Sequence, residues 1–339
     1  MGNAAGDDRL NIRQVAALAG VSHMTVSRVL NDSPNIRPET RAKVLKVIDE
    51  VKFRPNSAAR ALATKRSKRI GVIVDSAVEY GPGSTLRGVE EAAREAGYTV
   101  SSVTLAHTRD ESPHEAVEHL TSQGIDALCV IAPRSSSVDV LREITGGIPV
   151  LVVKADADAS FLTGSVDQRR GATLATEHLI SLGHREILHV AGPLDWLDAR
   201  ARERAWHAAV RKAGLREHPV VVGDWTSDFG YEFGRSVRSA PPFTAIFAAN
   251  DQMALGLLHG LREAGLDVPG DVSVVGFDDL PDARHFLPPL TTIRQDFHAL
   301  GVRTVESLRA SLEGTPLKHG FKIAPELVVR ASTAAPRER

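Results

Sequence analysis

The feature that most constrains the fold is an alternation, from Ile70 onward, of short apolar runs with amphipathic helical stretches. Strands that alternate with helices indicate βαβ units, in which helices cover both faces of a parallel sheet. The pattern extends over about 260 residues, which fits two lobes better than a single sheet. The apolar runs lie at residues 70–74, 127–132, 150–153, 187–191, 220–222, 245–248 and 272–276.

Cysteine content and the N-terminus bear on the compartment. Cys129 is the single cysteine, so no internal disulfide forms, as is typical of a reducing cytoplasm. Because Cys129 lies inside an apolar run, we interpret it as a small buried residue. Asp7 and Asp8 stand where a signal peptide would be apolar, and no stretch has the roughly 18 apolar residues that cross a bilayer. We therefore expect a cytoplasmic protein without membrane contact.

The net charge of −1 conceals two parts of opposite charge. Residues 1–69 hold 14 lysine and arginine residues against 6 aspartate and glutamate residues, and the remainder holds 27 against 36. A basic module on an acidic body favours contact with nucleic acid. A solvated charged face explains the charge alone equally well.

Residues 12–52 carry the pattern of three short helices with a tight turn between the first two. Helical spacing of apolar residues predicts a helix over 12–19, which Gly20 can end in the left-handed conformation. Ser22 can cap the second helix by accepting a bond from a backbone N–H. The side chains expected to point outward from that helix are His23, Met24, Ser27 and Arg28. Arg28 suits a guanine edge, because its guanidinium can donate to O6 and N7 together.

Four motifs resemble the head of the lactose/galactose (LacI/GalR) repressor family: QVA at 14–16, AGVS at 19–22, TVSRVLN at 25–31 and RPN at 54–56. Their order and spacing are more specific than a generic helix-turn-helix, the alternative being any small three-helix domain. The resemblance implies that the second helix reads an operator half-site, with His23, Met24 and Arg28 on the bases and Ser27 beside them. The matching candidates for phosphate contacts are Ser22, Thr25, Asn31 and Thr40.

The Ala-rich run 56–64 sits where the family has a hinge helix that orders in the minor groove of operator DNA. The resemblance places Asn56, Ala59 and Leu62 on the DNA, and Leu62 matches the residue that wedges between the central base pairs. An ordinary linker that happens to be helical is the alternative.

Motifs of the same family continue through the core: LGH at 182–184, AGP at 191–193, GDW at 223–225, ANDQMALG at 249–256, VGFDD at 275–279, and PPLTTI at 288–293 through QDF at 295–297. The predicted fold is an all-α helix-turn-helix head and an α/β core of two lobes with doubly wound parallel sheets, like a periplasmic sugar-binding protein. The expected parts are a head (1–54), a hinge (55–69), a core (70–332) and a tail (333–339). Within the core, the resemblance implies three crossings, with lobe one at about 70–166 and 297–322 and lobe two at about 167–296 and 323–332.

A binding site is expected beyond the carboxyl ends of the strands. A pyranose needs a flat apolar platform and planar groups that bond adjacent hydroxyls, which Trp225, Arg202, Asn250 and Asp278 can supply. All four match sugar-contacting positions of the family, and Gln295 and Phe297 match further ones. Each has a purely structural alternative: a core residue for the indole, a salt bridge for the arginine, and caps or turns for the other two.

The same strand-end rule adds Asp75 and Lys154, and two residues depart from the family's lactose-type pattern. Lys154 replaces an acidic pocket residue, and Glu79 replaces an apolar one. One interpretation is an internal ion pair of Lys154 with Asp75 or Glu79. The other is an altered effector, such as an acidic sugar or a different aglycone.

By this resemblance the chain is a transcription repressor that a small sugar, a galactoside or related glycoside, releases from a pseudo-palindromic operator. Two-fold symmetry requires a dimer, and no C-terminal heptads extend it to a tetramer. The alternatives are a corepressor-type member, as a purine-responsive relative is, and a sugar-binding module without regulation. No metal-ligand spacing or nucleophile elbow indicates an enzyme, so neither cofactor nor metal is expected.

Overall fold

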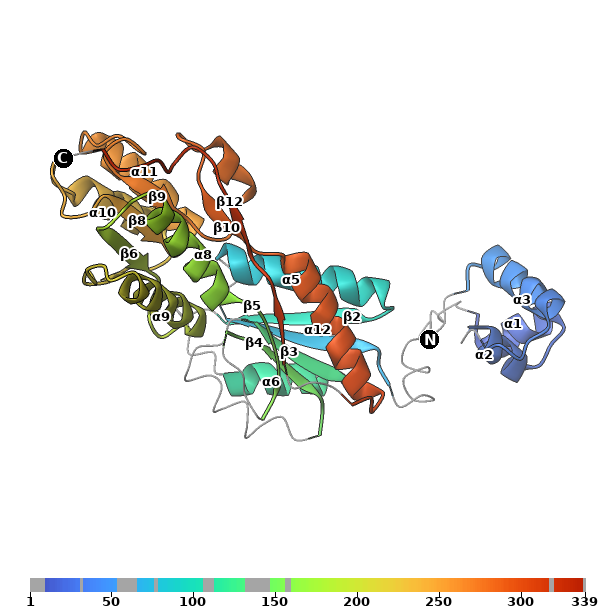
Figure 1. Cartoon of the computed structure of the whole chain (residues 1–339). Helices are drawn as coiled ribbons and strands as arrows, with labels where there is room; N and C mark the ends of the chain where they lie inside the picture. The colour runs from blue at the N-terminus through green and yellow to red at the C-terminus, as the bar shows by residue number, and fades with distance from the viewer. Residues whose placement is uncertain are drawn as a thin grey trace, which may run out of the picture. The chain divides into compact units, whose positions relative to one another are not determined.

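The computed structural model of the chain describes residues 10–30, 33–53, 66–75, 79–105, 113–131, 147–155, 160–316 and 320–337. It divides into two compact units, Met1–Ser67 and Lys68–Arg339, each of which is described by itself (Figure 1).

The first unit is a head of three helices, α1 (Ile12–Ala19), α2 (His23–Leu30) and α3 (Pro38–Glu50). Asn11 caps α1 in a reciprocal capping box with Gln14, and Gly20 ends that helix with a φ of 62°, which a glycine adopts without steric cost. A small core holds the three helices together, formed by Val15, Ala16, Ala19, Val26, Val29 and Val44. The helix-turn-helix predicted from the sequence is confirmed.

The second unit contains a parallel six-stranded sheet in the order β11-β5-β4-β3-β1-β2. Its strands are β1 (Arg69–Asp75), β2 (Thr99–Leu105), β3 (Ala127–Ile131), β4 (Val150–Val153), β5 (Leu162–Val166) and β11 (Gly320–Ile323). Alternate residues face opposite sides. One face packs on α5 (Tyr80–Glu95) and α12 (Phe297–Leu312), and the other packs on α6 (Pro113–Ser122).

The backbones of α5 and α12 touch, because a Cβ on Gly301 would lie 2.2 Å from the backbone carbon of Gly88. This close approach leaves no room for a side chain on either glycine. It fixes the start of α12 against α5, and the site described below draws residues from the first turns of both helices.

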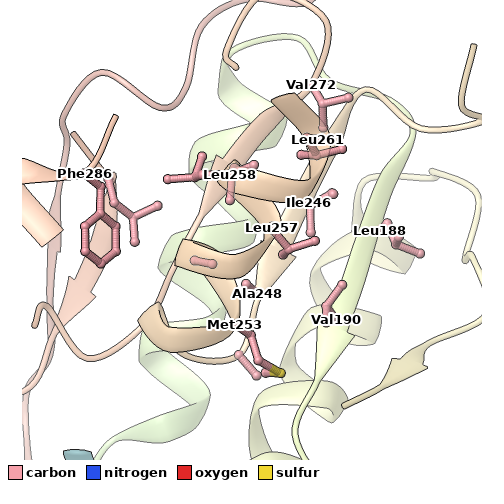
Figure 2. Close-up of a cluster of buried hydrophobic side chains, with 14 of the residues drawn as sticks. Leu188, Val190, Ile246, Ala248, Met253, Leu257, Leu258, Leu261, Val272 and Phe286 are labelled. Atoms are coloured by element: carbon pink, nitrogen blue, oxygen red, sulfur yellow. The ribbon is translucent and has the colours of Figure 1, made fainter. Parts of the chain in front are cut away.

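A second parallel sheet has the order β7-β6-β8-β9. Its strands are β6 (Ile187–Ala191), β7 (Val221–Val222), β8 (Ala245–Ala248) and β9 (Ser273–Val275). The helices are α8 (Gln168–Ser181), α9 (Leu197–Lys212), α10 (Ser227–Ser236) and α11 (Asp251–Glu263). Helices α8 and α9 share a core with one face. On the other face, Leu257 and Leu261 of α11 pack on Ile246 and Ala248 of β8 (Figure 2).

The chain passes between the two sheets three times. It crosses from β5 to α8, from β10 (Thr292–Arg294) to α12, and from β11 to β12 (Glu326–Val328), where β10 and β12 pair antiparallel. The two-lobed α/β core predicted from the sequence is therefore confirmed. Between β9 and β10 lies a short 3-10 helix, η1 (Pro281–His285).

Residues 333–337, which the sequence set apart as a tail, pack on the second sheet. His184 Nε2 lies 2.9 Å from the carbonyl oxygen of Ala334, and Arg337 reaches Asp271 at 3.1 Å. Within the described residues, no helix has the length and apolar character needed to cross a membrane.

Candidate effector site and DNA-binding head

The exposed side of α2 carries the side chains that the sequence assigned to base reading. Ser22, His23, Met24 and Arg28 are exposed, and Met24 retains 54% of its surface. Val26 and Val29, on the other side of the helix, are buried. A helix of this kind presents its first turn and one arginine to a DNA groove.

Ser22 and Thr25 already have partners inside the head. The Thr25 backbone N–H donates to Ser22 Oγ at 3.1 Å, and the two hydroxyls lie 3.0 Å apart. Ser22 thus caps α2, as predicted. Ser27 and Thr40 are half-buried. The other sequence candidates, Asn31, Asn56, Ala59 and Leu62, lie outside the described residues.

In the second unit, a cavity lies between the two lobes. Lobe one lines it with Glu79, Gly81, Pro82, Thr85, Ile131, Val153, Ser165, Val166, Phe297 and Leu300. Lobe two and the crossing segments line it with Gln168, Trp196, Asp198, Arg202, Trp225, Asn250, Asp278 and Gln295. Seven of the nine effector candidates therefore meet here.

A closed ring of four buried side chains forms the polar side of this cavity. Arg202 Nε donates to Gln168 Oε1 at 2.8 Å, and Gln168 Nε2 donates to Gln295 Oε1 at 2.9 Å. Gln295 Nε2 donates to Asp278 Oδ1 at 2.6 Å, and that oxygen lies 3.9 Å from Arg202 Nη2. Each member has less than 9% of its surface exposed, so each hydrogen bond is made away from water.

Arg202 is held further by its surroundings. Its Nη1 donates to the carbonyl oxygen of Ala249, and its guanidinium lies 3.8 Å from the centre of the Phe277 ring. The guanidinium also lies 5.7 Å from the centre of the Trp225 ring. These contacts fix the guanidinium plane, so its remaining N–H groups have a set direction.

Two residues of the cavity have strained backbones. Trp225 has a φ of 74° and Asp278 a φ of 115°, values that residues other than glycine rarely adopt. The Trp225 ring lies directly on Gly192, where a Cβ would come within 2.2 Å of the indole. Trp196 meets the same indole edge-to-face with ring centres 5.6 Å apart. The strain and the packing together present a rigid aromatic surface.

Asn250 serves the fold as well as the cavity. Its Oδ1 accepts the Met253 N–H at 3.0 Å as the cap of α11, and its Nδ2 donates to the Trp225 carbonyl oxygen at 2.9 Å. Asn250 therefore caps a helix, the structural role that the sequence offered as an alternative, and it also lines the cavity. The cap also ties the strained tryptophan loop to α11.

Asp75 and Lys154 are buried but do not line the cavity. The strand-end rule places residues at the correct edge of a sheet without saying which face they take. Ile131 and Val153, which line the cavity, belong to the face that packs on α5 and α12. Val152 belongs to the opposite face, so alternation along the strand directs Lys154 to that face too.

Sequence reasoning missed Gln168, Trp196 and Asp198 as cavity residues. Gln168 is the first residue of α8, directly after a crossing, and no strand-end signal marks it. The other two lie in the DWLD segment that leads into α9, and this segment follows the AGP motif closely enough to have indicated them. Within the described chain no group of histidine, cysteine and acidic residues is arranged to hold a metal.

Burial dominates the electrostatics of the site. It raises the pKa of Asp278 to about 6, although Arg202 and the hydrogen bond from Gln295 pull that pKa down. Burial also lowers the pKa of Arg202, and the negative charge of Asp278 opposes this shift. Nearby Asp251, which accepts bonds from Thr292 and the Leu280 backbone, has a pKa raised well above its usual value, also by burial first.

The raised pKa of Asp278 makes a prediction for stability against pH. A carboxyl whose pKa is higher in the folded chain favours folding when protonated, so its contribution is complete below pH 4 and is lost as the pH rises through about 6. Relative to Asp278→Asn, the free energy of unfolding of the wild type should fall by on the order of 3 kcal/mol across this window. Urea unfolding of both proteins at pH 4 to 7 measures it, and a constant difference would contradict it.

Gln168 supplies a second prediction. Gln168→Leu leaves Arg202 Nε and Gln295 Oε1 buried without their partners, which should weaken effector binding about 5- to 100-fold. Gln168→Glu keeps the acceptor for the arginine and should lose less. Calorimetric titration of the effector measures both, and equal affinity in Gln168→Leu and wild type would show that the ring does not position the site.

A helix-turn-helix head and a two-lobed core with a cavity between its lobes define a ligand-responsive DNA-binding regulator. The family model for bacterial regulatory proteins of the lacI family matches residues 11–56, and the periplasmic binding protein-like domain matches residues 176–333. The chain is 32% identical over 329 residues to the lactose operon repressor of Escherichia coli (strain K12), covering 96% of this chain and 91% of that protein. The chain belongs to the lacI family of transcription regulators.

Two further relatives are informative. The HTH-type transcriptional repressor PurR of Haemophilus influenzae is 34% identical over 333 residues, covering 95% of this chain and 98% of that one. The crystal structure of the lac repressor dimer bound to operator and the anti-inducer ONPF superposes with a TM-score of 0.84 at 31% identity, covering 97% of this chain and 100% of that chain. These relatives are transcription repressors rather than enzymes, as the motifs predicted.

Proposed function

We propose that the chain is a homodimeric repressor of a pseudo-palindromic operator, and that a small sugar, a galactoside or related glycoside, releases it. The cavity between the lobes supports this proposal. It combines a rigid indole surface with a ring of planar polar groups, which is what the two sides of a pyranose require.

The polar groups have bonding capacity left for a ligand. Arg202 has five N–H groups, and two of them bond described residues of the chain. Gln295 and Arg202 both approach Oδ1 of Asp278, so its Oδ2 is the acceptor for a ligand hydroxyl. Adjacent hydroxyls on a ring lying over Trp225 would meet these two residues as a pair.

The ring also offers a route from the effector to the lobes. Gln168 lies at the crossing from β5 to α8, and Gln295 lies at the crossing from β10 to α12. A ligand that bonds Arg202 and Asp278 competes with the bonds that these residues make to the two glutamines, and so changes how the lobes are held. Effector and operator must then weaken each other's binding by the same factor.

The corepressor interpretation is the second candidate, and similarity to a PurR repressor favours it. The two candidates differ in sign. An inducer lowers the affinity of the repressor for its operator, and a corepressor raises it.

Fluorescence anisotropy tests the proposal. The labelled DNA is a palindromic site from the region upstream of the gene for this protein, and the complex of protein and DNA is titrated with galactosides and other glycosides. Release by a glycoside supports it, and tighter binding favours the corepressor. Operator binding that no glycoside changes would remove the sugar from the proposal.

The proposed dimer predicts the effect of a surface substitution. Leu287 is 77% exposed and Leu255 is 41% exposed, and Leu287 shares a surface hollow with Leu258, one turn along α11 from Leu255. We place the interface of the proposed dimer at this patch, where an aspartate at position 287 would lose its water on dimerisation, so Leu287→Asp should shift the protein toward monomer by at least tenfold in Kd. Sedimentation measures it, with the exposed Val222→Asp as control. Unchanged dimerisation of Leu287→Asp would place the interface elsewhere.

A further inference from the structure

The wall that the described residues of lobe one contribute to the cavity is mainly apolar, and its charged side chain is Glu79. The same wall contains the apolar residues Pro82, Ile131, Phe297 and Leu300. The Oε2 atom of Glu79 is buried and has no hydrogen-bond partner among the described residues. The carboxylate does not cap the helix that follows it either, since α5 begins at Tyr80 without a side-chain cap.

A second unpartnered polar atom lies on the other side of the cavity. Trp225 is 92% buried, and its indole Nε1–H has no acceptor among the described residues. Two residues that line the cavity therefore carry an unpartnered polar atom, a donor on Trp225 of lobe two and an acceptor on Glu79 of lobe one. Burying such atoms without partners costs free energy, and a ligand that supplies an acceptor for one and a donor for the other removes that cost.

The charges that line the cavity decide which kind of donor fits Glu79. Among the described residues that line it, the carboxylates are those of Glu79, Asp198 and Asp278, and the cation is Arg202. Arg202 faces Asp278 at 3.9 Å, and the second cation that the sequence placed here, Lys154, does not line the cavity. The lining is thus net negative, which disfavours an anionic ligand.

From these observations we propose that the effector is an amino sugar or an amine-bearing glycoside whose ammonium group meets Glu79, while an oxygen of the same ligand accepts from Trp225. This inference rests on the proposed function and names the chemical class of the effector. A charge-assisted bond from an ammonium is about twice as strong as one from a neutral hydroxyl, and the apolar wall strengthens it further. An acidic sugar would place a second carboxylate beside Glu79.

The expected order of affinity follows. The amino sugar binds about 10- to 100-fold more tightly than the neutral sugar of the same ring, and the matching uronic acid binds most weakly. Acetylation of the amine removes its charge and should remove the advantage.

The test is calorimetric titration of the full chain at pH 7 with galactosamine and glucosamine, galactose and glucose, the two N-acetyl forms, and galacturonic and glucuronic acids. Glu79→Gln keeps the shape of the side chain and should erase the preference for the amines. Glu95→Gln, an exposed position at the end of the same helix, removes the same charge outside the cavity and should keep it.

Neutral sugars that bind as tightly as amines, or a preference for amines that survives Glu79→Gln, would overturn the inference and leave the proposed function standing. If none of these sugars binds while another glycoside shifts the anisotropy of the labelled operator, the inference fails alone. If no glycoside shifts it, the sugar is removed from the proposed function and the inference fails with it.

Discussion

Arg202→Leu should leave a repressor that binds its operator and no longer responds to its effector. The substitution removes the donors that face the cavity, takes the partner from Gln168 and leaves Asp278 buried without its cation. Each charge-assisted hydrogen bond from the guanidinium to the ligand contributes about 1.5 to 3 kcal/mol, so losing even one should lower effector affinity roughly 10- to 150-fold. Residues 1–67 form a separate compact unit, so operator affinity should change little.

Operator anisotropy with and without effector measures both quantities for Arg202→Leu. Arg204→Leu is a matched control, because this arginine is exposed two residues further along α9. Arg202→Lys keeps the charge without the planar fork and should recover folding stability more than effector affinity. If Arg202→Leu is released by the effector within threefold of the wild-type concentration, the arginine does not bind ligand.

How far the sequence predicts the fold depends on the strand. Runs such as Val150–Val153, buried on both faces of the sheet, are continuous in apolar residues and were found. The edge strand β2, Thr99–Leu105, mixes exposed and half-buried residues and contains four serine and threonine residues, so it has no continuous apolar run. In β5 a glycine, Gly164, interrupts the run because the Phe321 ring packs where its side chain would be. Pairing with β4 and β11, rather than its own residues, makes β5 a strand.

The residues of the site likewise divide into those that the sequence marks and those that it does not. Asn250 and Asp278 follow the buried strands β8 and β9, and Trp225 follows the short strand β7, each in a recognisable motif, so their arrival at one edge could be predicted. The partners that orient them could not. Gln168 and Gln295 are 127 positions apart and are joined by one 2.9 Å hydrogen bond, which no local pattern encodes. Lys154 was predicted in the cavity and does not line it, because the strand-end rule fixes the edge of the sheet and leaves the face open. A shift of one position at the end of a strand moves a side chain to the other face.

Arg28→Ala should weaken operator binding more than any other substitution of one exposed side chain in the head. Arg28 is exposed on α2, and its neighbours Val26 and Val29 hold the helix from beneath. A bidentate arginine–guanine contact contributes about 1 to 3 kcal/mol. In the proposed dimer each half-site loses one contact, so about 2 to 6 kcal/mol is lost, or roughly 30- to 10⁴-fold in affinity.

The base-reading role has a signature that charge removal alone lacks. Lys46→Ala removes a charge from α3, where Lys46 is exposed and lies 3.8 Å from Glu50, and should weaken binding to all sequences slightly and equally. Arg28→Ala should instead weaken the operator strongly and random DNA weakly, so that the ratio of the two affinities collapses. Anisotropy with operator and scrambled duplexes at fixed salt measures this ratio. A ratio that stays at the wild-type value would mean that Arg28 contacts phosphate, and that His23 and Met24 read the half-site without it.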